Sequence, residues 1–218
     1  MKKSNVGVLI GVVAIVFLGG FFFYKKSTGA PLRYLPYFGS KKPIPGDTIY
    51  HTIPDFSFVN QDGKIITKEN VLGKIYVADY FFTTCQSICP VMKKQMNRVY
   101  KRFPNDSEIL FLSHTVDPET DSIQTMKEFS MRFNADSKKW MFLTGNKKDL
   151  YDLARKGYLI EASEGDGGAQ DFIHTQNFAL IDKEFHIRGY YDGTDSVEVD
   201  KLMYEIDLLK KEYTEREK

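Results

Sequence analysis

From residue 55 onward, the hydrophobic and polar positions change repeatedly between short apolar runs and one-sided patterns with helical spacing. Apolar runs typical of strands occupy residues 55–59, 64–67, 74–82, 108–112, 140–143, 177–181 and 186–190. One-sided apolar patterns typical of helices follow Pro90 and occupy residues 123–133, 149–156 and 199–213. The β-α-β-α-β order between residues 74 and 143 predicts a parallel sheet.

Turn signals separate some of these elements. Gln61-Asp-Gly63 stands between the first two predicted strands and is typical of a hairpin turn. Asp182-Lys-Glu184 forms a short connection between the last two strands. The roughly 170 residues from Asp47 to Lys218 are enough for one domain with a substantial core.

The beginning of the chain has a different pattern, because Val6 to Tyr24 contains no charged residue. A helix of roughly 19 residues is just long enough to cross a hydrocarbon core of about 30 Å. A cleaved signal peptide is the alternative, but Phe21 to Tyr24 are bulky where a cleavage site needs small residues. We therefore expect a single-pass anchor in the cell membrane. Lysines flank both ends, so charge does not decide the orientation; our working hypothesis places the C-terminal part on the extracytoplasmic, periplasmic side.

A segment rich in proline, glycine and lysine follows the apolar run and has neither a helical nor an alternating period. The sequence therefore predicts three parts: a membrane anchor at 1–24, a tether at 25–46 and a folded domain at 47–218. The 27% of charged residues and the net charge of +1 are ordinary for a globular protein, and we expect no nucleic-acid partner.

The only two cysteines of the chain, Cys85 and Cys89, stand between a predicted strand and the helix that starts near Pro90. A thiol at a helix N-terminus faces unpaired backbone N–H groups and the positive end of the helix dipole. Both favour the thiolate, which is the form that attacks disulfides and binds metals. Since Pro90 fits the first helical position, we expect Cys89 near the N-cap and Cys85 in the preceding loop.

Two cysteines four residues apart can close a disulfide, chelate a metal or form half of a zinc site. Structural zinc would need two more ligands from His51, His114, His174 and His186, and none of these is paired at the short spacing of zinc fingers. Two thiolates and one imidazole form a soft, low-coordinate set that suits Cu(I).

His174 is the best candidate for the imidazole, since it follows the glycine-rich acidic stretch 161–168 and precedes a strand. His114, after a central strand, is the second choice, and we expect His51 and His186 to be structural or exposed. A lone histidine is more often a structural or surface residue than a ligand, so this alternative stays open for His174 when only the residue pattern is considered.

Other candidates near the cysteines have simpler explanations. Met92 and Met96 have helical spacing with the apolar residues that follow, which indicates core packing rather than copper ligation. Asp79, within an apolar strand, is a candidate buried acid that assists proton transfer at the thiols. The acidic segment 161–171 is typical of a solvated loop, although it could attract a cation or a basic partner.

Three motifs together resemble the Sco/SenC family: Thr84-Cys-Gln-Ser-Ile-Cys-Pro90, Ser113-His-Thr-Val-Asp-Pro-Glu-Thr-Asp121 and Phe172-Ile-His-Thr175. The resemblance implies a thioredoxin-like α/β fold, with a central mixed sheet flanked by helices and an inserted hairpin. It implies that Cys85, Cys89 and His174 bind copper for delivery to the copper-bearing subunit of cytochrome c oxidase. It also assigns Asp117 to a position that supports the site.

Two departures from the family pattern concern partner choice and redox tuning rather than the ligands. The family often has Pro-Asp between the cysteines where this chain has Gln86 and Ser87, and it often has Ser where this chain has Thr175.

Three functions remain in competition. The first is a membrane-tethered copper metallochaperone that needs a thiol reductant, because a Cys85–Cys89 disulfide offers no thiolates. The second is an enzyme, a thiol-disulfide oxidoreductase in which Cys85 attacks and Cys89 resolves. The third is a binding module with a structural or redox-sensing disulfide. A thiol peroxidase is disfavoured, because no cationic residue is evident beside Cys85.

Overall fold

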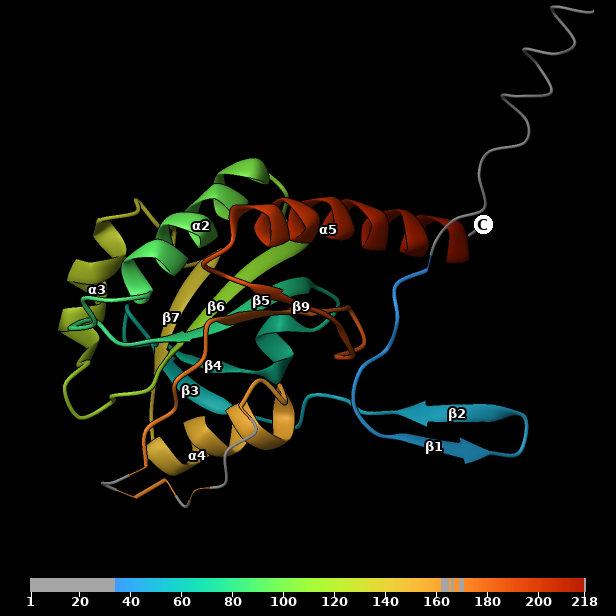
Figure 1. The fold of residues 1–218 in the computed structure, drawn as a ribbon, viewed down its shortest axis with the longest axis horizontal. Coiled ribbons are helices and arrows are strands. Elements are labelled where there is room, and N and C mark those ends of the chain that lie inside the picture. The colour runs from blue at the N-terminus through green and yellow to red at the C-terminus, as the bar shows by residue number, and fades with distance from the viewer. Residues whose placement is uncertain (1–33, 162–164, 166, 169–170, 218) are drawn as a thin grey trace, which may run out of the picture. The chain divides into compact units, whose positions relative to one another are not determined.

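Strands of the described part of the chain form one seven-stranded mixed sheet; the structure is a computed structural model and describes residues 34–161, 165, 167–168 and 171–217 (Figure 1). The spatial order is β4-β3-β7-β6-β5-β8-β9. The strands are β3 (Ser57–Asn60), β4 (Ile65–Thr67), β5 (Ile75–Phe81), β6 (Ile109–Thr115), β7 (Trp140–Thr144), β8 (Asn177–Ile181) and β9 (Ile187–Asp192). Strands β5, β6 and β7 are parallel, whereas β3, β4, β8 and β9 pair antiparallel. The predicted parallel unit is thus confirmed at the centre of the mixed sheet.

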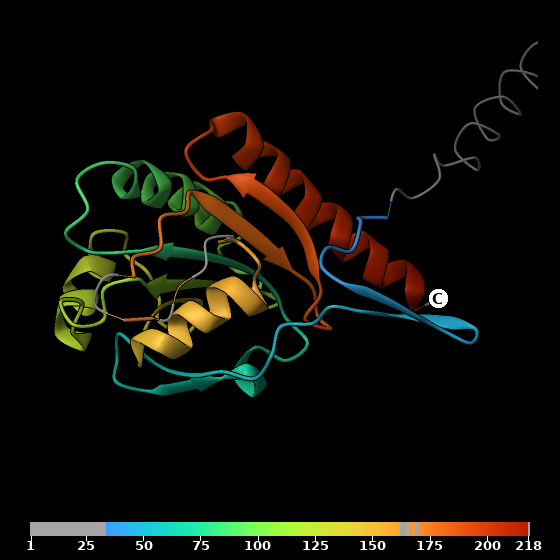
Figure 2. The same ribbon diagram turned by 60° about the horizontal axis from the view of Figure 1, so that its bottom comes forward.

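Helices cover both faces of this sheet. They are α2 (Cys89–Arg102), α3 (Ile123–Met131), α4 (Lys147–Asp152), which continues into a π turn at Leu153–Gly157, and α5 (Ser196–Arg216). Helices α2 and α5 lie together on one face, and α4 lies on the opposite face (Figures 1 and 2). This is the expected thioredoxin-like α/β arrangement of a mixed sheet flanked by helices.

The central strands are buried along their whole length. Every residue of β5 and of β6 is buried, since helices cover both faces of the parallel part of the sheet. Polar side chains within these two strands are therefore removed from water and need internal partners. Asp79, Ser113 and His114 are in this position, with exposed fractions of 0%.

The turn signals act as the sequence predicts. Strands β3 and β4 pair antiparallel around the Asp-Gly turn, in which Gly63 has a φ of +74°, a conformation that favours glycine. Strands β8 and β9 pair across the short connection that contains Asp182.

The compact unit begins at Leu35, twelve residues before Asp47. The described part of the segment interpreted as a tether carries regular structure, because β1 (Lys41–Ile44) and β2 (Asp47–Tyr50) form a separate antiparallel hairpin. The sequence of this hairpin contains prolines and lysines and shows no alternating apolar pattern. Its strands are defined by cross-strand pairing rather than by burial. The predicted span at residues 6–24 lies outside the described residues. Within the described residues, no helix has the length and apolar character that crossing a bilayer requires.

Candidate metal and redox centre

Both cysteines lie where the sequence places them, between a central strand and a helix. Strand β5 ends at Phe81, and α2 begins at Cys89, so Pro90 stands in the first turn, where its missing N–H costs no hydrogen bond. Cys85 lies in the connecting loop, and its N–H donates to the Phe82 carbonyl at 3.3 Å. Both thiols are free.

The two thiols differ in exposure and in acidity. Cys85 is half-buried; burial opposes its ionisation, but hydrogen bonds from Cys89 and Ser87 outweigh this and lower the pKa of Cys85 to about 7. Cys89 is 5% exposed, and burial together with the hydrogen bond to Cys85 raises the pKa of Cys89 to about 12. The expectation that the helix N-terminus favours a thiolate therefore fails for Cys89, where desolvation is the larger effect, whereas Cys85 in the preceding loop owes its lowered pKa to hydrogen bonds from Cys89 and Ser87.

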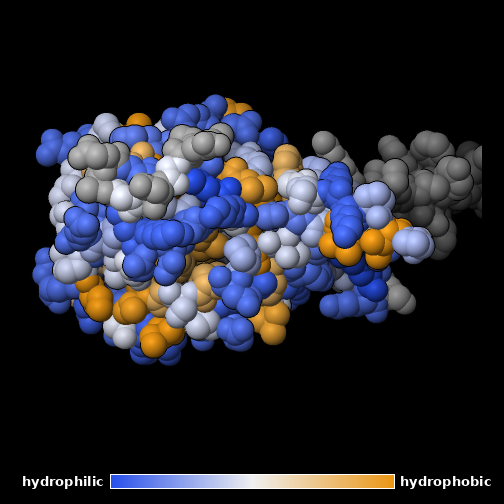
Figure 3. Space-filling view, turned by 90° about the horizontal axis from the view of Figure 1, so that it is seen from below, coloured by the Kyte–Doolittle hydropathy of each residue, from blue (hydrophilic) through white to orange (hydrophobic). Residues whose placement is uncertain are grey.

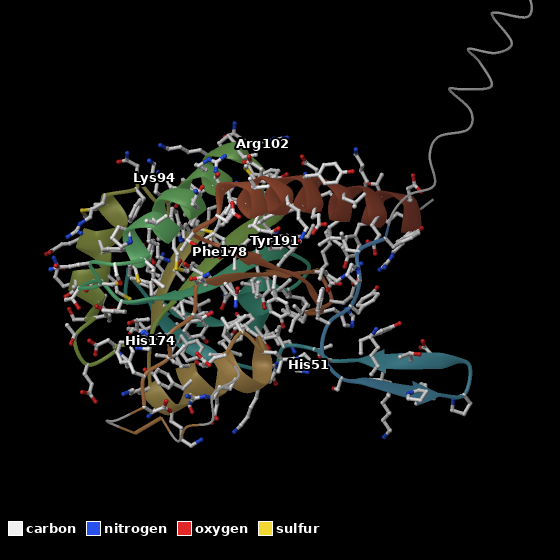
Figure 4. All side chains as sticks on the ribbon, viewed as in Figure 1. His51, Lys94, Arg102, His174, Phe178 and Tyr191 are labelled. Atoms are coloured by element: carbon white, nitrogen blue, oxygen red, sulfur yellow. The ribbon has the colours of Figure 1, made fainter. Side chains whose placement is uncertain are left out.

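His174 shares a cavity with both cysteines. The cavity measures about 240 Å³ and is lined by Tyr80, Phe81, Phe82, Cys85, Ser87, Ile88, Cys89, Val116, Ile173, His174 and Thr175. His174 itself is exposed, and it lies on the segment that leads into β8 (Figure 4). The three predicted ligands are thus brought to one place by β5, α2 and this segment.

An aromatic chain and an ion pair hold the His174 segment. The Phe172 ring lies 4.8 Å from the His174 ring and 5.3 Å from the Phe82 ring, measured between centroids, and so joins the histidine to the end of β5. Asp171 accepts two hydrogen bonds from Arg155, at 2.6 and 2.7 Å. Several residues of the predicted acidic loop, 162–164, 166 and 169–170, lie outside the described residues.

The donor atoms have not closed around one point. Among the described residues, one group of three possible ligand residues has its donor atoms within 4.8 Å of one another, and it consists of Asp182, Glu184 and His186. That group is not a convincing metal site, because Asp182 already accepts hydrogen bonds from Arg188 and His186. A metal at the cysteines would require the exposed imidazole of His174 to move toward them.

The remaining histidines have structural partners. The His114 Nε2 lies 3.2 Å from the Tyr158 hydroxyl, and burial lowers the pKa of His114 to about 3. His114 contacts Tyr80, with ring centroids 5.0 Å apart, but does not itself line the cavity, which makes it a weaker candidate than His174. His51 contacts the Gly157 carbonyl at 2.7 Å, and His186 lies 3.3 Å from the Asp182 carboxylate.

The two methionines of α2 pack in the core, as the sequence predicts. Met92 and Met96 are 1% and 0% exposed.

A fully buried ion pair lies one helical turn beyond Cys89, and the sequence pattern indicated only its aspartate. The Lys93 Nζ donates to Asp79 at 2.6 Å and to the Ser113 hydroxyl at 2.7 Å. The ammonium also faces the Phe81 ring at 4.3 Å. A buried aspartate inside an apolar strand needs a hydrogen-bonding or charged partner. Asp79 was therefore the feature of the sequence that pointed to a buried pair.

A second buried aspartate supports the cysteine loop. Asp121 accepts hydrogen bonds from the N–H and the hydroxyl of Thr83, two residues before Cys85, and from the Thr115 hydroxyl at 2.5 Å. Asp117, the residue that the resemblance selects, is half-buried and contributes backbone hydrogen bonds to this turn. The side-chain support for the loop therefore comes from the other aspartate of the same motif.

Comparison with known proteins places these features in a family. The model of the SCO1/SenC family matches residues 46–207. The SCO1 protein homolog of Bacillus subtilis (strain 168) is 28% identical over 162 residues, which cover 73% of this chain and 83% of the relative.

Two solved structures have the same fold. A SCO1/SenC family lipoprotein from Bacillus anthracis is 28% identical with a TM-score of 0.63, covering 73% of this chain and 95% of that chain. BsSco, described as a member of the Sco family of cytochrome c oxidase assembly proteins with a disulfide switch, is 27% identical with a TM-score of 0.62, covering 73% and 93%. This chain belongs to the SCO1/SenC family.

Proposed function

We propose that this protein is a membrane-anchored copper metallochaperone that holds one copper ion on Cys85, Cys89 and His174 and delivers it to cytochrome c oxidase during assembly. The observation that carries the proposal is the meeting of two free thiols and one exposed imidazole at a single cavity of about 240 Å³. Thiolate and imidazole are soft or intermediate donors, and Cu(I) accepts such a set with three ligands. The chain belongs to the same family as BsSco, which is described as a member of a family of cytochrome c oxidase assembly proteins. This supports cytochrome c oxidase as the recipient of the copper.

The arrangement suits release as well as binding. Cys89 is fixed on the first turn of α2, whereas Cys85 lies on a loop and His174 is exposed. A recipient can therefore displace the imidazole first and then the half-buried thiolate of Cys85, while Cys89 remains bound to the ion until the last ligand exchange. Loading needs both cysteines reduced, so a thiol reductant is a necessary partner.

The anchor is the second part of the proposal. Residues 6–24 are uncharged and long enough to cross a bilayer, and residues 1–24 would hold the folded domain, through a short tether, at the extracytoplasmic face. The Bacillus anthracis relative is a lipoprotein, a class of protein that attached lipid holds at a membrane.

A titration with Cu(I) tests the copper site. The reduced full chain in detergent is titrated against a competing chelator, beside His174→Ala and the control His51→Ala, which removes an imidazole outside the cavity. We expect one copper per chain, an affinity lowered about tenfold or more by His174→Ala, and no change with the control. Equal affinities for all three proteins would remove His174 from the ligand set, and a protein without specific copper binding would overturn the proposal.

A thiol-disulfide oxidoreductase is the second candidate, and the unequal thiols favour it. Cys85, with a pKa of about 7, can attack a disulfide of a target protein. One target sulfur then leaves as a thiolate, and Cys89 displaces the second sulfur to form a Cys85–Cys89 disulfide. The target gains two thiols, and this protein loses two. If His174→Ala retains this exchange and loses copper, both activities belong to the same cysteine pair.

A further inference from the structure

The hairpin formed by β1 and β2 projects from the folded unit at the end where the chain enters it (Figure 1). These strands pair with each other in a sheet of their own. A two-stranded hairpin is marginally stable alone in water, so a projecting one calls for an explanation. The outer face of the hairpin carries exposed apolar side chains. The hairpin lies near the point where the chain enters the folded unit, and this position indicates which surface covers those side chains.

The two faces of the hairpin have different characters. In the antiparallel register Lys42 lies opposite Ile49 and Ile44 opposite Asp47, and these four residues share one face. Ile44 is 38% exposed and Ile49 is 54% exposed. Figure 3 shows the resulting apolar patch on the hairpin, at the right of that view.

The other face is turned toward the folded unit. The Tyr50 ring stacks on the Tyr37 ring with centroids 4.3 Å apart, and its edge contact with His186 is at 6.1 Å. Tyr50 and Ile49 are neighbours in one strand, so their side chains point in opposite directions. The isoleucines therefore face away from the unit.

Backbone hydrogen bonds fix the direction in which the hairpin projects. The Phe38 N–H donates to the Ile187 carbonyl at 2.9 Å, and the His51 N–H donates to the Ser40 carbonyl at 2.9 Å. The base of the hairpin is thereby joined to β9. The outer face is presented in a defined orientation rather than at the end of a free loop.

The point where the chain enters the unit is equally fixed. Leu35 is buried; its N–H donates to Glu212 at 3.3 Å, and its carbonyl accepts from Arg188 at 2.7 Å. Arg188 in turn contacts Glu212 at 2.8 Å, and both side chains are fully buried. This network holds the first residues of the unit against α5 and β9.

The length of chain before Leu35 limits how far the unit can lie from an anchor at residues 6–24. The ten residues from Lys25 to Tyr34 span at most about 35 Å when fully extended. The hairpin starts only six residues after Leu35, so it belongs to the part of the unit that such an anchor keeps nearest the bilayer. His174 lies at the opposite end of the unit from the hairpin (Figure 4).

We propose that the outer face of the hairpin, defined by Lys42, Ile44, Asp47 and Ile49, rests on the phospholipid bilayer that holds the anchor. The isoleucines enter the boundary between headgroups and acyl chains, and the exposed Lys42 on the same face meets anionic headgroups. Asp47 is the one acidic side chain of the hairpin and lies at its turn, where its carboxylate accepts from the Thr48 N–H. The inference rests on the proposed anchor, since a tethered domain needs only a weak contact to stay bound. Its consequence is an orientation in which the cysteine cavity points away from the membrane surface.

A fluorescence experiment on the full chain in lipid nanodiscs tests this contact. Ile49→Trp places an indole on the outer face, and Ile65→Trp is the matched control, since Ile65 is a similarly exposed isoleucine of another antiparallel hairpin, β3–β4. The only natural tryptophan, Trp140, is fully buried and gives the same background in both variants. Nanodiscs contain phosphatidylcholine and phosphatidylglycerol, with or without bromine on the acyl chains. Co-elution of protein and lipid verifies that the chain is attached to the nanodisc.

We expect brominated lipid to quench about half of the added fluorescence of Ile49→Trp, because an interfacial residue lies about 5–10 Å deep, and to leave Ile65→Trp unchanged. Adding Lys42→Glu should reduce the quenching of Ile49→Trp. If protein and lipid co-elute but brominated lipid quenches both variants equally or quenches neither, the hairpin contact is overturned and the anchor is not. Loss of co-elution would overturn the anchor and the hairpin contact with it. A dimer in detergent that shields the indole of Ile49→Trp in the absence of bilayer would assign the face to a second copy and would also overturn the proposal.

Discussion

The Lys93 ammonium lies 2.6 Å from the Asp79 carboxylate, and both side chains are fully shielded from solvent. Lys93 stands four residues after Cys89, on the same helix. Burial lowers the pKa of Lys93, and the neighbouring carboxylate opposes this effect. The Ser113 hydroxyl donates to Asp79 and accepts from Lys93 and from the Trp140 indole, so the charges are surrounded by satisfied hydrogen-bonding groups. Through Lys93, this buried cluster lies one helical turn after Cys89.

Removing one member of the pair should destabilise the fold. Lys93→Met leaves Asp79 buried without its cation, for which we expect a loss of about 3–5 kcal/mol in the free energy of unfolding. Urea denaturation of the reduced protein measures it. Lys94→Met, at the exposed neighbouring position, is the control and should change stability little. An equal loss in both variants would show that the buried pair is not responsible.

The acidity of Cys85 should govern alkylation of the protein. Since the pKa of Cys85 is about 7 and that of Cys89 about 12, the thiolate of Cys85 forms first as pH rises. We expect the iodoacetamide reaction at Cys85 to reach half of its limiting rate near pH 7, with Cys89 unmodified throughout neutral pH. Mass spectrometry of the peptides gives both rates.

Ser87 offers a separate test of the cause. Its hydroxyl lies 3.5 Å from the Cys85 sulfur and is one of the groups that lower the pKa of Cys85. Ser87→Ala should therefore shift the alkylation profile to higher pH, whereas Thr84→Ala, in the same exposed loop, should leave it in place. An unchanged profile in Ser87→Ala would assign the low pKa to the remaining hydrogen bonds.

Asp121 should matter more for the site than Asp117 does. Asp121→Asn replaces one of the two acceptor oxygens by an NH2 group, so the hydroxyls of Thr83 and Thr115 cannot both keep their acceptor, and an unsatisfied buried group costs about 1–3 kcal/mol. We expect lower thermal stability and weaker Cu(I) binding, because the loop before Cys85 loses its support. Asp117→Asn keeps the backbone hydrogen bonds of the turn and should have a smaller effect on both measurements. The reverse order would favour the assignment of Asp117 that the resemblance implies.

Local patterns predicted most of the fold. The strands of residues 75–81 and 109–115 and helix α2 follow from apolar runs and one-sided spacing, which record burial directly. The first hairpin was missed because its residues are exposed, so pairing leaves no apolar period. Strand order was likewise invisible, since β3 and β8 join the parallel strands through contacts distant in sequence.

The two cysteines of the site could be predicted from the sequence, but the residues that support them were harder to predict. The strand–helix junction indicated Cys85 and Cys89, and the position of His174 before a strand made it the first choice among the histidines, which the resemblance then supported; all three line the same cavity. The burial of Lys93 could not be predicted from the pattern of its helix, because it depends on Asp79 fourteen positions earlier. The low acidity of Cys89 was equally hidden, since burial is a property of the folded chain.

Phe172 should set the position of His174 during copper binding. Its ring contacts the His174 ring at 4.8 Å and the Phe82 ring at 5.3 Å, and such aromatic contacts are worth about 0.5–1.5 kcal/mol each. Phe172→Leu keeps an apolar side chain but loses both ring contacts, so we expect about a two- to tenfold weaker Cu(I) affinity with little change in stability. Because the effect acts through the imidazole, Phe172→Leu should add nothing in a His174→Ala background, and the double mutant tests this. If the two substitutions are additive, the ring acts on the cysteines or on the fold, and its role in positioning His174 is wrong.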